Sequence, residues 1–247
     1  MTAEEIVSCE SENSYNTLHY RNSLINNDVN HWRNHVASTT YTTHELGAVI
    51  NFLKKRPLFV SATEFGYCAE QVAQGKLGAP ASVITIKFED GTIVKHTHLT
   101  GSLAPYNKIS QARYTHKDGR TWLVTGDRIK EYNGDNVSLV YLTESGTDSA
   151  WDAHIKCINL FINKIQGIEK DYSALHDVYE AVDITLPGIL GFKSITQNGA
   201  EIEIPNLRDK AVRDLYRNDT TCTFPDVAGD MYISAGIMRN DNKDYVE

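Results

Sequence analysis

Paired cysteines and long apolar runs are missing from this sequence of 247 residues. No two cysteines form a CxxC pair, and the first twelve residues hold no apolar core. No run approaches the ~18 apolar residues that a membrane span needs. These absences argue against a disulfide-built secreted domain, a signal peptide and a membrane partner. They predict a cytoplasmic protein with reduced thiols at four scattered cysteines, Cys9, Cys68, Cys157 and Cys222.

A dense basic stripe is also missing, and the formal net charge is −8. Proteins that bind DNA or RNA polymers neutralise many phosphates with lysine and arginine. The charge therefore argues against polymeric nucleic acid as the main partner. A small anionic ligand stays compatible with it, because a local pocket can be positive inside an acidic protein.

The familiar catalytic and metal-binding motifs do not occur either. The sequence has no HExxH, no GxSxG and no GxxxxGK[ST]. His96 and His98 lie two apart on a predicted strand, so their side chains share one face. No third ligand follows at a recognisable spacing, and a polar strand face is the simpler interpretation. The sequence predicts neither a metal site nor a cofactor.

Strand patterns fill the first two thirds of the chain. Residues 81–88 alternate in polarity, Asp90-Gly91 is a favoured two-residue turn, and residues 92–99 return. A second pair follows at residues 111–116 and 121–124.

Helical patterns follow from Trp151 onward. Residues 151–165 carry apolar side chains at helical spacing. Residues 171–183 predict a second helix that stops at Pro187-Gly188, and residues 195–204 predict a hairpin that turns at Asn198-Gly199. The fold class is α+β and predominantly antiparallel β, with one or two helices in the second half. Residues 1–12 are expected to be a flexible leader, and residues 13–247 a single domain.

Tyr172 and His176 are four residues apart, so they would share one face of the predicted helix over residues 171–183. A phenol and an imidazole on one face could meet the same scissile phosphate. Such pairs are more often packing contacts, so the spacing alone decides nothing.

The order and spacing of several short segments resemble the poxin family, the cyclic-GMP-AMP nucleases of poxviruses, baculoviruses and some insects. The resemblance extends, with gaps, over residues 15–204. The segments that carry it are Tyr15-Asn16-Thr17-Leu18-His19, Lys54-Lys55-Arg56, residues 75–80, residues 109–126, Asp171-Tyr172-Ser173 and Pro187-Gly188.

The resemblance implies a chymotrypsin-protease-like β scaffold and a nuclease activity without metal. It implies cleavage of the 3′–5′ phosphodiester of 2′,3′-cGAMP by attack of the neighbouring 2′-hydroxyl, which would block cGAS–STING-type immune signalling. The small-molecule partner would be this cyclic dinucleotide, and the location the host cytosol if the protein is viral. The family also suggests a homodimer.

The same resemblance implies a site made of His19, Tyr172 and His176. The family has a lysine where His176 stands, and a histidine is competent there because imidazole exchanges protons near neutral pH. We interpret His176 as the general base, His19 as the general acid and Tyr172 as the residue that orients the hydroxyl. Arg56 is a candidate contact to a phosphate or a purine edge. A rival alignment places Lys156 or Lys164 at the lysine position.

Two other classes of function stay open at this point. A homologue that has lost the lysine could sequester cyclic dinucleotides without cutting them. A viral structural or protein-interaction domain on the same scaffold is the third interpretation. Protease activity ranks last, because no serine or cysteine nucleophile stands in a recognisable glycine-flanked motif.

Overall fold

The computed structural model describes residues 2–14, 38–65, 81–99, 110–125, 128–142, 150–168 and 175–219. The strands are β1 (Ile6–Ser14), β2 (Pro57–Phe65), β3 (Ala81–Phe88), β4 (Ile93–Leu99), β5 (Ser110–His116), β6 (Thr121–Thr125), β7 (Arg128–Asn133), β8 (Asn136–Leu142) and β9 (Ile202–Glu203). The helices are η1 (Ala3–Glu5), η4 (Ser38–Tyr41), α2 (Thr43–Leu53), α4 (Ala150–Gln166), α5 (Val178–Thr196) and α6 (Lys210–Tyr216).

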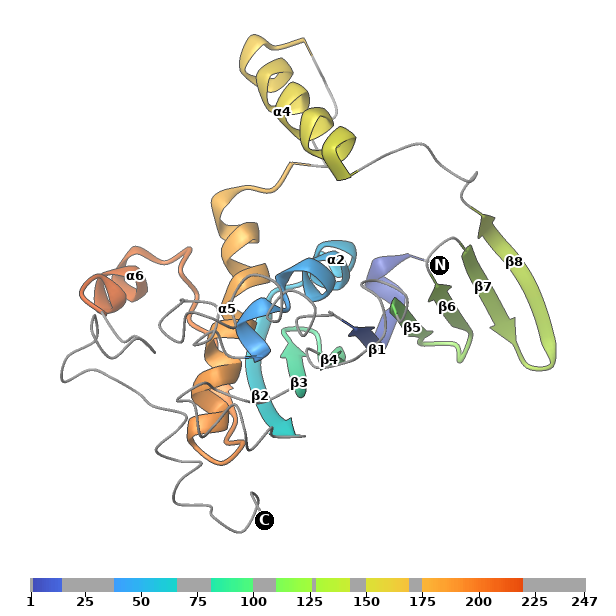
Figure 1. Ribbon diagram of the computed structural model, residues 1–247, viewed down its shortest axis with the longest axis horizontal. Coiled ribbons are helices and arrows are strands. Elements are labelled where there is room, and N and C mark those ends of the chain that lie inside the picture. Colours follow the sequence, from blue (N-terminus) through green and yellow to red (C-terminus); the bar gives the residue numbers. More distant parts are fainter. Residues whose placement is uncertain are drawn as a thin grey trace, which may run out of the picture.

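The strands form one nine-stranded sheet in the order β8-β7-β6-β5-β1-β4-β3-β2-β9. β1 and β4 run parallel, with Ser8 opposite Ile93 and Ser14 opposite Leu99. The other recorded neighbours are antiparallel. The sheet is therefore mixed, with its one described parallel pair at the centre (Figure 1).

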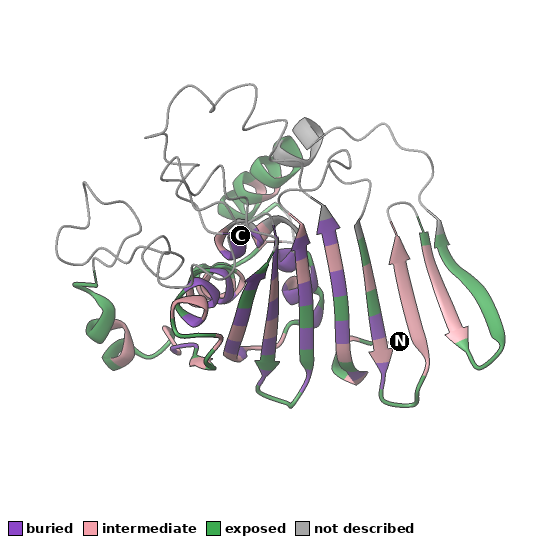
Figure 2. Ribbon diagram, turned by 60° about the horizontal axis from the view of Figure 1, so that its bottom comes forward, coloured by how far each residue is buried: buried purple, intermediate pink, exposed green. Residues whose placement is uncertain are grey.

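Alternating side chains give the central strands one apolar face. In β3 and β4, Ile84, Ile86 and Val94 are fully buried, while their sequence neighbours reach the other face. Figure 2 shows this as alternating buried and less buried bands along the strands. The predicted hairpin over residues 81–99 is confirmed, with Gly91 at φ 86° in its turn. The predicted pairing of residues 111–116 with 121–124 is confirmed as β5 and β6.

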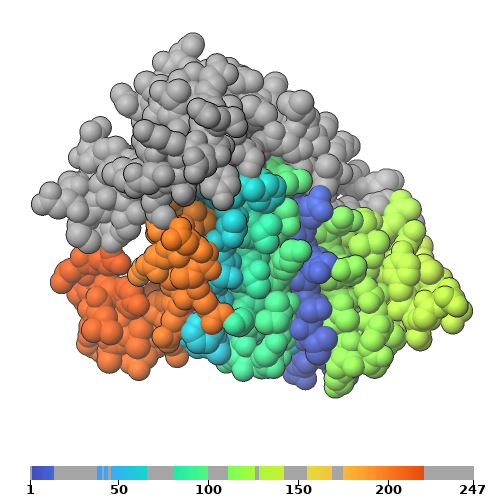
Figure 3. All heavy atoms as spheres, turned by 90° about the horizontal axis from the view of Figure 1, so that it is seen from below, coloured from blue at the N-terminus to red at the C-terminus, as the bar shows by residue number. Residues whose placement is uncertain are grey.

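Helices α2 and α5 cover the apolar face of the sheet. Leu46, Ile50 and Leu53 of α2 join the same core as the buried strand residues. Figure 3 views the opposite face, where β1 lies between β3/β4 and β5 with no described helix over them. Helix α4 stands apart from the sheet and from α2 and α5 (Figure 1).

The chymotrypsin-protease-like, predominantly antiparallel scaffold is wrong as a fold class. The strands lie in one open mixed sheet, and α2 packs on it from the first half of the chain. Alternating polarity identifies a strand but not its partner, so the parallel β1–β4 pair left no local sign. Within the expected flexible leader, residues 6–12 belong to β1, which lies in the middle of the sheet.

The second predicted helix differs from the structure at both ends. Helix α5 begins at Val178 and continues through Pro187 to Thr196. The helix does not stop at Pro187-Gly188 because these residues pack against η4, where Gly188 lies beside the Thr39 backbone. The hairpin predicted over residues 195–204 is also wrong, since its first residues end α5 and β9 holds only Ile202–Glu203.

No helix in the described part of the chain is both long and apolar enough to cross a membrane.

Candidate functional site

A cavity of about 400 Å³ opens where the C-terminal end of α2 meets the start of α5. Its walls carry many charged side chains. The charged and imidazole side chains around it are Lys54, Lys55, Arg56, Glu89, His176, Glu180, Asp183 and Arg208. Four cations and three carboxylates line the cavity, and two of the cations are arginines.

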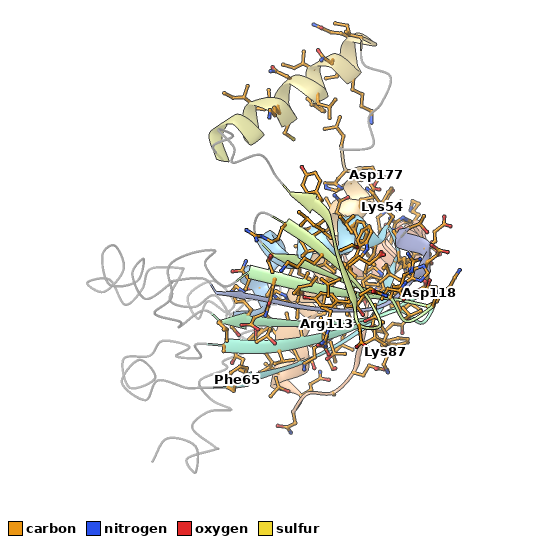
Figure 4. The ribbon with its side chains drawn as sticks, turned by 90° about the vertical axis from the view of Figure 1, so that its right-hand side faces the viewer. Lys54, Phe65, Lys87, Arg113, Asp118 and Asp177 are labelled. Atoms are coloured by element: carbon orange, nitrogen blue, oxygen red, sulfur yellow. The ribbon has the colours of Figure 1, made fainter. Side chains whose placement is uncertain are left out.

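Lys54 sits at the C-cap of α2 in the left-handed backbone region, at φ 54° and ψ 31°. Glycine is the usual residue at such a position, because a Cβ atom is disfavoured there. Lys54 instead sends an ammonium group to within 3.5 Å of the Glu180 carboxylate. Figure 4 shows Lys54 at the same end of the molecule as Asp177, the N-cap residue of α5.

Two arginines reach the cavity from distant parts of the sequence. Arg56 donates from Nη2 to the Ile204 carbonyl at 2.9 Å, and its Nε has no partner among the described residues. Arg208 donates from Nη1 to Asp183 Oδ2 at 2.7 Å, and its guanidinium lies 5.6 Å from the centre of the Tyr179 ring. Each guanidinium is held on one side and keeps further donors for a ligand.

Lys55 plays a structural part at the rim of the cavity. Its ammonium group lies 2.6 Å from Asp90 Oδ2 and donates to the Ile6 carbonyl at 2.8 Å. Because these contacts use its donors, we assign Lys55 to holding the start of β1 against the β3–β4 turn, and the ligand contacts to the other cations.

The start of α5 positions the acidic side of the cavity. Asp177 accepts hydrogen bonds from the Tyr179 and Glu180 amides at 2.8 and 2.7 Å. Glu180 accepts in return from the Asp177 amide at 2.9 Å, which completes a capping box. His176 precedes the helix, and its Nδ1 lies 3.9 Å from the Glu180 carboxylate.

Asp183 lies one turn further along α5. Burial raises the pKa of its carboxyl above the usual value, while the hydrogen bond from Arg208 acts in the opposite direction. A buried carboxyl held by one arginine can fix that arginine in place for a ligand.

A second cavity, of about 270 Å³, lies on the open face of the sheet. Lys95, Glu10 and Arg113 lie in one cross-strand row there, and Arg113 pairs with Glu10. Arg113 is labelled in Figure 4. Because Arg113 and Glu10 neutralise each other and both are half-exposed, we take this face as a solvated row of ion pairs.

The two histidines of β4 are fully buried beneath the helices. His96 Nδ1 lies 2.8 Å from Ser11 Oγ, and its ring centre lies 6.1 Å from that of His98. They share one face of β4, but it is the covered face and not a solvated one. Among the described residues, no group of three or more histidine, cysteine, aspartate or glutamate side chains could hold a metal ion.

The structure brings two of the four predicted site residues together. His176 and Arg56 line the same cavity, while His19 and Tyr172 lie outside the described residues. Since α5 begins at Val178, His176 does not sit on the predicted helix face. The rival base Lys164 belongs to α4, as does Lys156, and neither lines the cavity.

Sequence reasoning missed Arg208, Asp183 and Glu180. The pattern Asp177-Val178-Tyr179-Glu180 is a capping box followed by an apolar stretch, and it would have placed the start of α5. No comparable local signal joins Arg208 to Asp183, because their contact depends on how the chain returns after α5.

No protein-family model and no curated protein sequence matches the chain. Several solved structures of oxidoreductases match it in fold. This chain shares their fold. The UDP-N-acetylglucosamine 3-dehydrogenase of Acidithiobacillus ferrooxidans matches with a TM-score of 0.56 at 12% identity, over 78% of this chain and 54% of that one.

Two further oxidoreductases give the same result. The aldose-aldose oxidoreductase of Caulobacter crescentus has a TM-score of 0.56 at 9% identity, over 81% of this chain and 56% of its own. An NAD binding oxidoreductase of Klebsiella pneumoniae has a TM-score of 0.56 at 12% identity, over 81% and 59%. The chain therefore spans somewhat more than half the length of these proteins.

The poxin assignment is wrong, and its consequences go with it. The matched structures are oxidoreductases. The predictions of a 2′,3′-cGAMP nuclease activity and of a cyclic-dinucleotide partner are therefore wrong. So are the two alternatives, a sequestering homologue and a viral structural domain. The resemblance rested on short segments. Its closest stretch, residues 109–126, contains the β5–β6 hairpin, and hairpins occur in many folds.

Proposed function

We propose that this chain is the substrate-binding part of a sugar oxidoreductase, and that the cavity between α2 and α5 holds a small, polyhydroxylated, negatively charged substrate. The observation that carries the proposal is a cavity lined by Lys54, Arg56 and Arg208, on a fold shared with sugar-converting dehydrogenases. Fold alone does not assign an activity, so the side chains around the cavity carry the chemical argument.

The cations favour an anionic group on the substrate. Arg56 and Arg208 are each fixed by one protein contact, so little side-chain entropy is lost when a ligand binds. Lys54 adds a partly exposed positive charge at the rim. A phosphate or carboxylate between such groups forms charge-assisted hydrogen bonds.

Neutral polar groups in the same wall suit hydroxyl groups. Asn51 and Asn206 line the cavity, and an amide both donates and accepts hydrogen bonds. His176 adds an imidazole that can do the same. A ligand with several hydroxyl groups and one acidic group satisfies this set better than an apolar one.

The described residues do not fit a nicotinamide dinucleotide. The sequence contains no GxGxxG, and the described sheet lacks the run of parallel strands that carries this fingerprint. We therefore assign this cavity to the substrate and derive no cofactor contact from it.

Thermal unfolding with a panel of ligands tests the binding site. We expect sugar phosphates and sugar acids to raise the melting temperature of the full chain in a saturable way, and the matching neutral sugars to do so less. Lys54→Gln should weaken binding about tenfold by loss of one charge contact. Lys87→Gln is the matched control, because Lys87 is an equally exposed lysine paired with a carboxylate outside the cavity.

Lys54→Gly separates ligand loss from misfolding. Glycine accepts the left-handed backbone, so this variant should unfold at the same temperature or higher while it binds more weakly. A panel in which no anionic sugar binds would overturn the site. If the neutral sugars raise the melting temperature as much as the sugar phosphates and sugar acids do, the assignment of an acidic substrate fails.

We further propose that the protein acts in the cytoplasm. Cys9 and Cys157 are free thiols in the described part of the chain, which suits a reducing compartment.

A further inference from the structure

Helix α4 carries an apolar stripe that faces solvent. Ile155, Ile158, Ile162 and Ile165 are between 42% and 71% exposed. Figures 1 and 4 both show the helix standing away from the sheet. A stripe of large apolar side chains left in water is a common mark of an interaction surface.

The spacing of the stripe indicates what kind of partner it fits. The four isoleucines follow one another at intervals of three, four and three residues, which is the a/d pattern of packed helices. Phe161 extends the stripe on one side, and it is also exposed. A stripe of this width fits a helical bundle.

Other surfaces of the same chain fit the stripe poorly. The covered face of the sheet is already occupied by α2 and α5. The open face carries the charged row of Lys95, Glu10 and Arg113, which an isoleucine stripe would desolvate.

The flanks of the stripe allow identical helices to pack together. Asn159 and Gln166 stand beside the isoleucines, and neither is charged. Copies of α4 can therefore approach without like-charge repulsion along the contact, although each chain has a net charge of −8. Isoleucine at both a and d positions favours three or four helices over two.

We propose that the chain self-associates as a trimer through α4, with the isoleucine stripes of three copies packed in one bundle. Between Ile155 and Ile165 the stripe runs for about 15 Å along α4. The inference is independent of the proposed function, since no residue of the stripe lines the cavity.

Light scattering during size-exclusion chromatography tests the trimer over roughly a hundredfold range of protein concentration. We expect the wild-type mass to approach three times the 27.7 kDa of one chain at the upper end. Ile158→Glu with Ile162→Glu should remain at the mass of one chain throughout, because charge cannot be buried in the bundle. The control is Lys156→Gln with Asn163→Glu, which changes the net charge equally on the other side of α4 and should stay trimeric.

Three results would overturn the proposal. One is a wild-type chain that stays monomeric at every concentration, and another is a stable dimer. The third is a lower melting temperature of the glutamate variant at dilutions where the wild type is also a monomer. That drop would mean that α4 packs on its own chain.

Discussion

His96 is a buried base whose protonation opposes folding. It has no exposed surface, and burial lowers its pKa from 6.5 to about 4. The unfolded chain therefore binds a proton more readily than the folded one. Stability from this residue is complete above about pH 6.5 and declines as the pH falls toward about 4.

We expect the wild type to lose on the order of 3 kcal/mol of unfolding free energy between about pH 7 and pH 4 through His96. Urea denaturation at several pH values measures this free energy. In His96→Gln, the unfolding free energy should change less between about pH 7 and pH 4. Thr185→Gln, at an exposed position that does not titrate, is the control and should leave the profile unchanged. Glu5 loses its contribution to stability only at lower pH. Hydrogen bonds, the strongest of them with His116, lower the pKa of its carboxyl from 4.5 to about 2, so its contribution falls only below about pH 4.5. An unchanged profile in His96→Gln would show that another group is responsible.

Gly188 allows α5 to approach η4 closely. A Cβ atom at this position would lie 2.6 Å from the Thr39 carbonyl oxygen, which is backbone and cannot rotate away. We expect Gly188→Ala to cost about 1–3 kcal/mol in urea denaturation, despite the higher helix propensity of alanine. Thr185→Ala, on the exposed side of the same helix, should have little effect. Equal stability of Gly188→Ala and wild type would mean that η4 moves freely.

At the scale of elements, the start of α5 links helix stability to the cavity. Asp177 caps the helix and stands between His176 and Glu180. Asp177→Ala should lower the melting temperature by a few degrees, while Asp177→Asn, which keeps the accepting oxygen, should lower it less. Hydrogen exchange at the Tyr179 and Glu180 amides should rise in the alanine variant, because both lose their acceptor. No rise at these amides would contradict the capping role.

Elements whose shape depends on neighbouring residues, such as a hairpin turn or an amphipathic helix, were predictable from the sequence. The β3–β4 hairpin follows from alternation around Asp90-Gly91, and α4 follows from its isoleucine spacing. Helix α5 was misread because Pro187 normally ends a helix, whereas here close packing at Gly188 outweighs it. Arg56 and His176 line the cavity, and their role in a site stays a prediction, whereas Arg208 reaches the cavity only through tertiary structure.

At the scale of the whole molecule, strand order carried no sequence signal. β1 pairs with β4 and β5, whose residues lie some 85 to 110 positions later. Neither alternation nor turn chemistry reports on partners so far along the chain. This is why two correctly predicted hairpins, β3–β4 and β5–β6, still led to a wrong fold class and to a wrong family.

The central position of β1 also bears on how the protein is made. During synthesis β1 leaves the ribosome before the other described strands, and both its neighbours are translated much later. Until residue 99 emerges, the strand has two open edges and an apolar face without its partners. The nascent chain is therefore most exposed to misassembly, and most in need of a chaperone, before the middle of its own sheet can close.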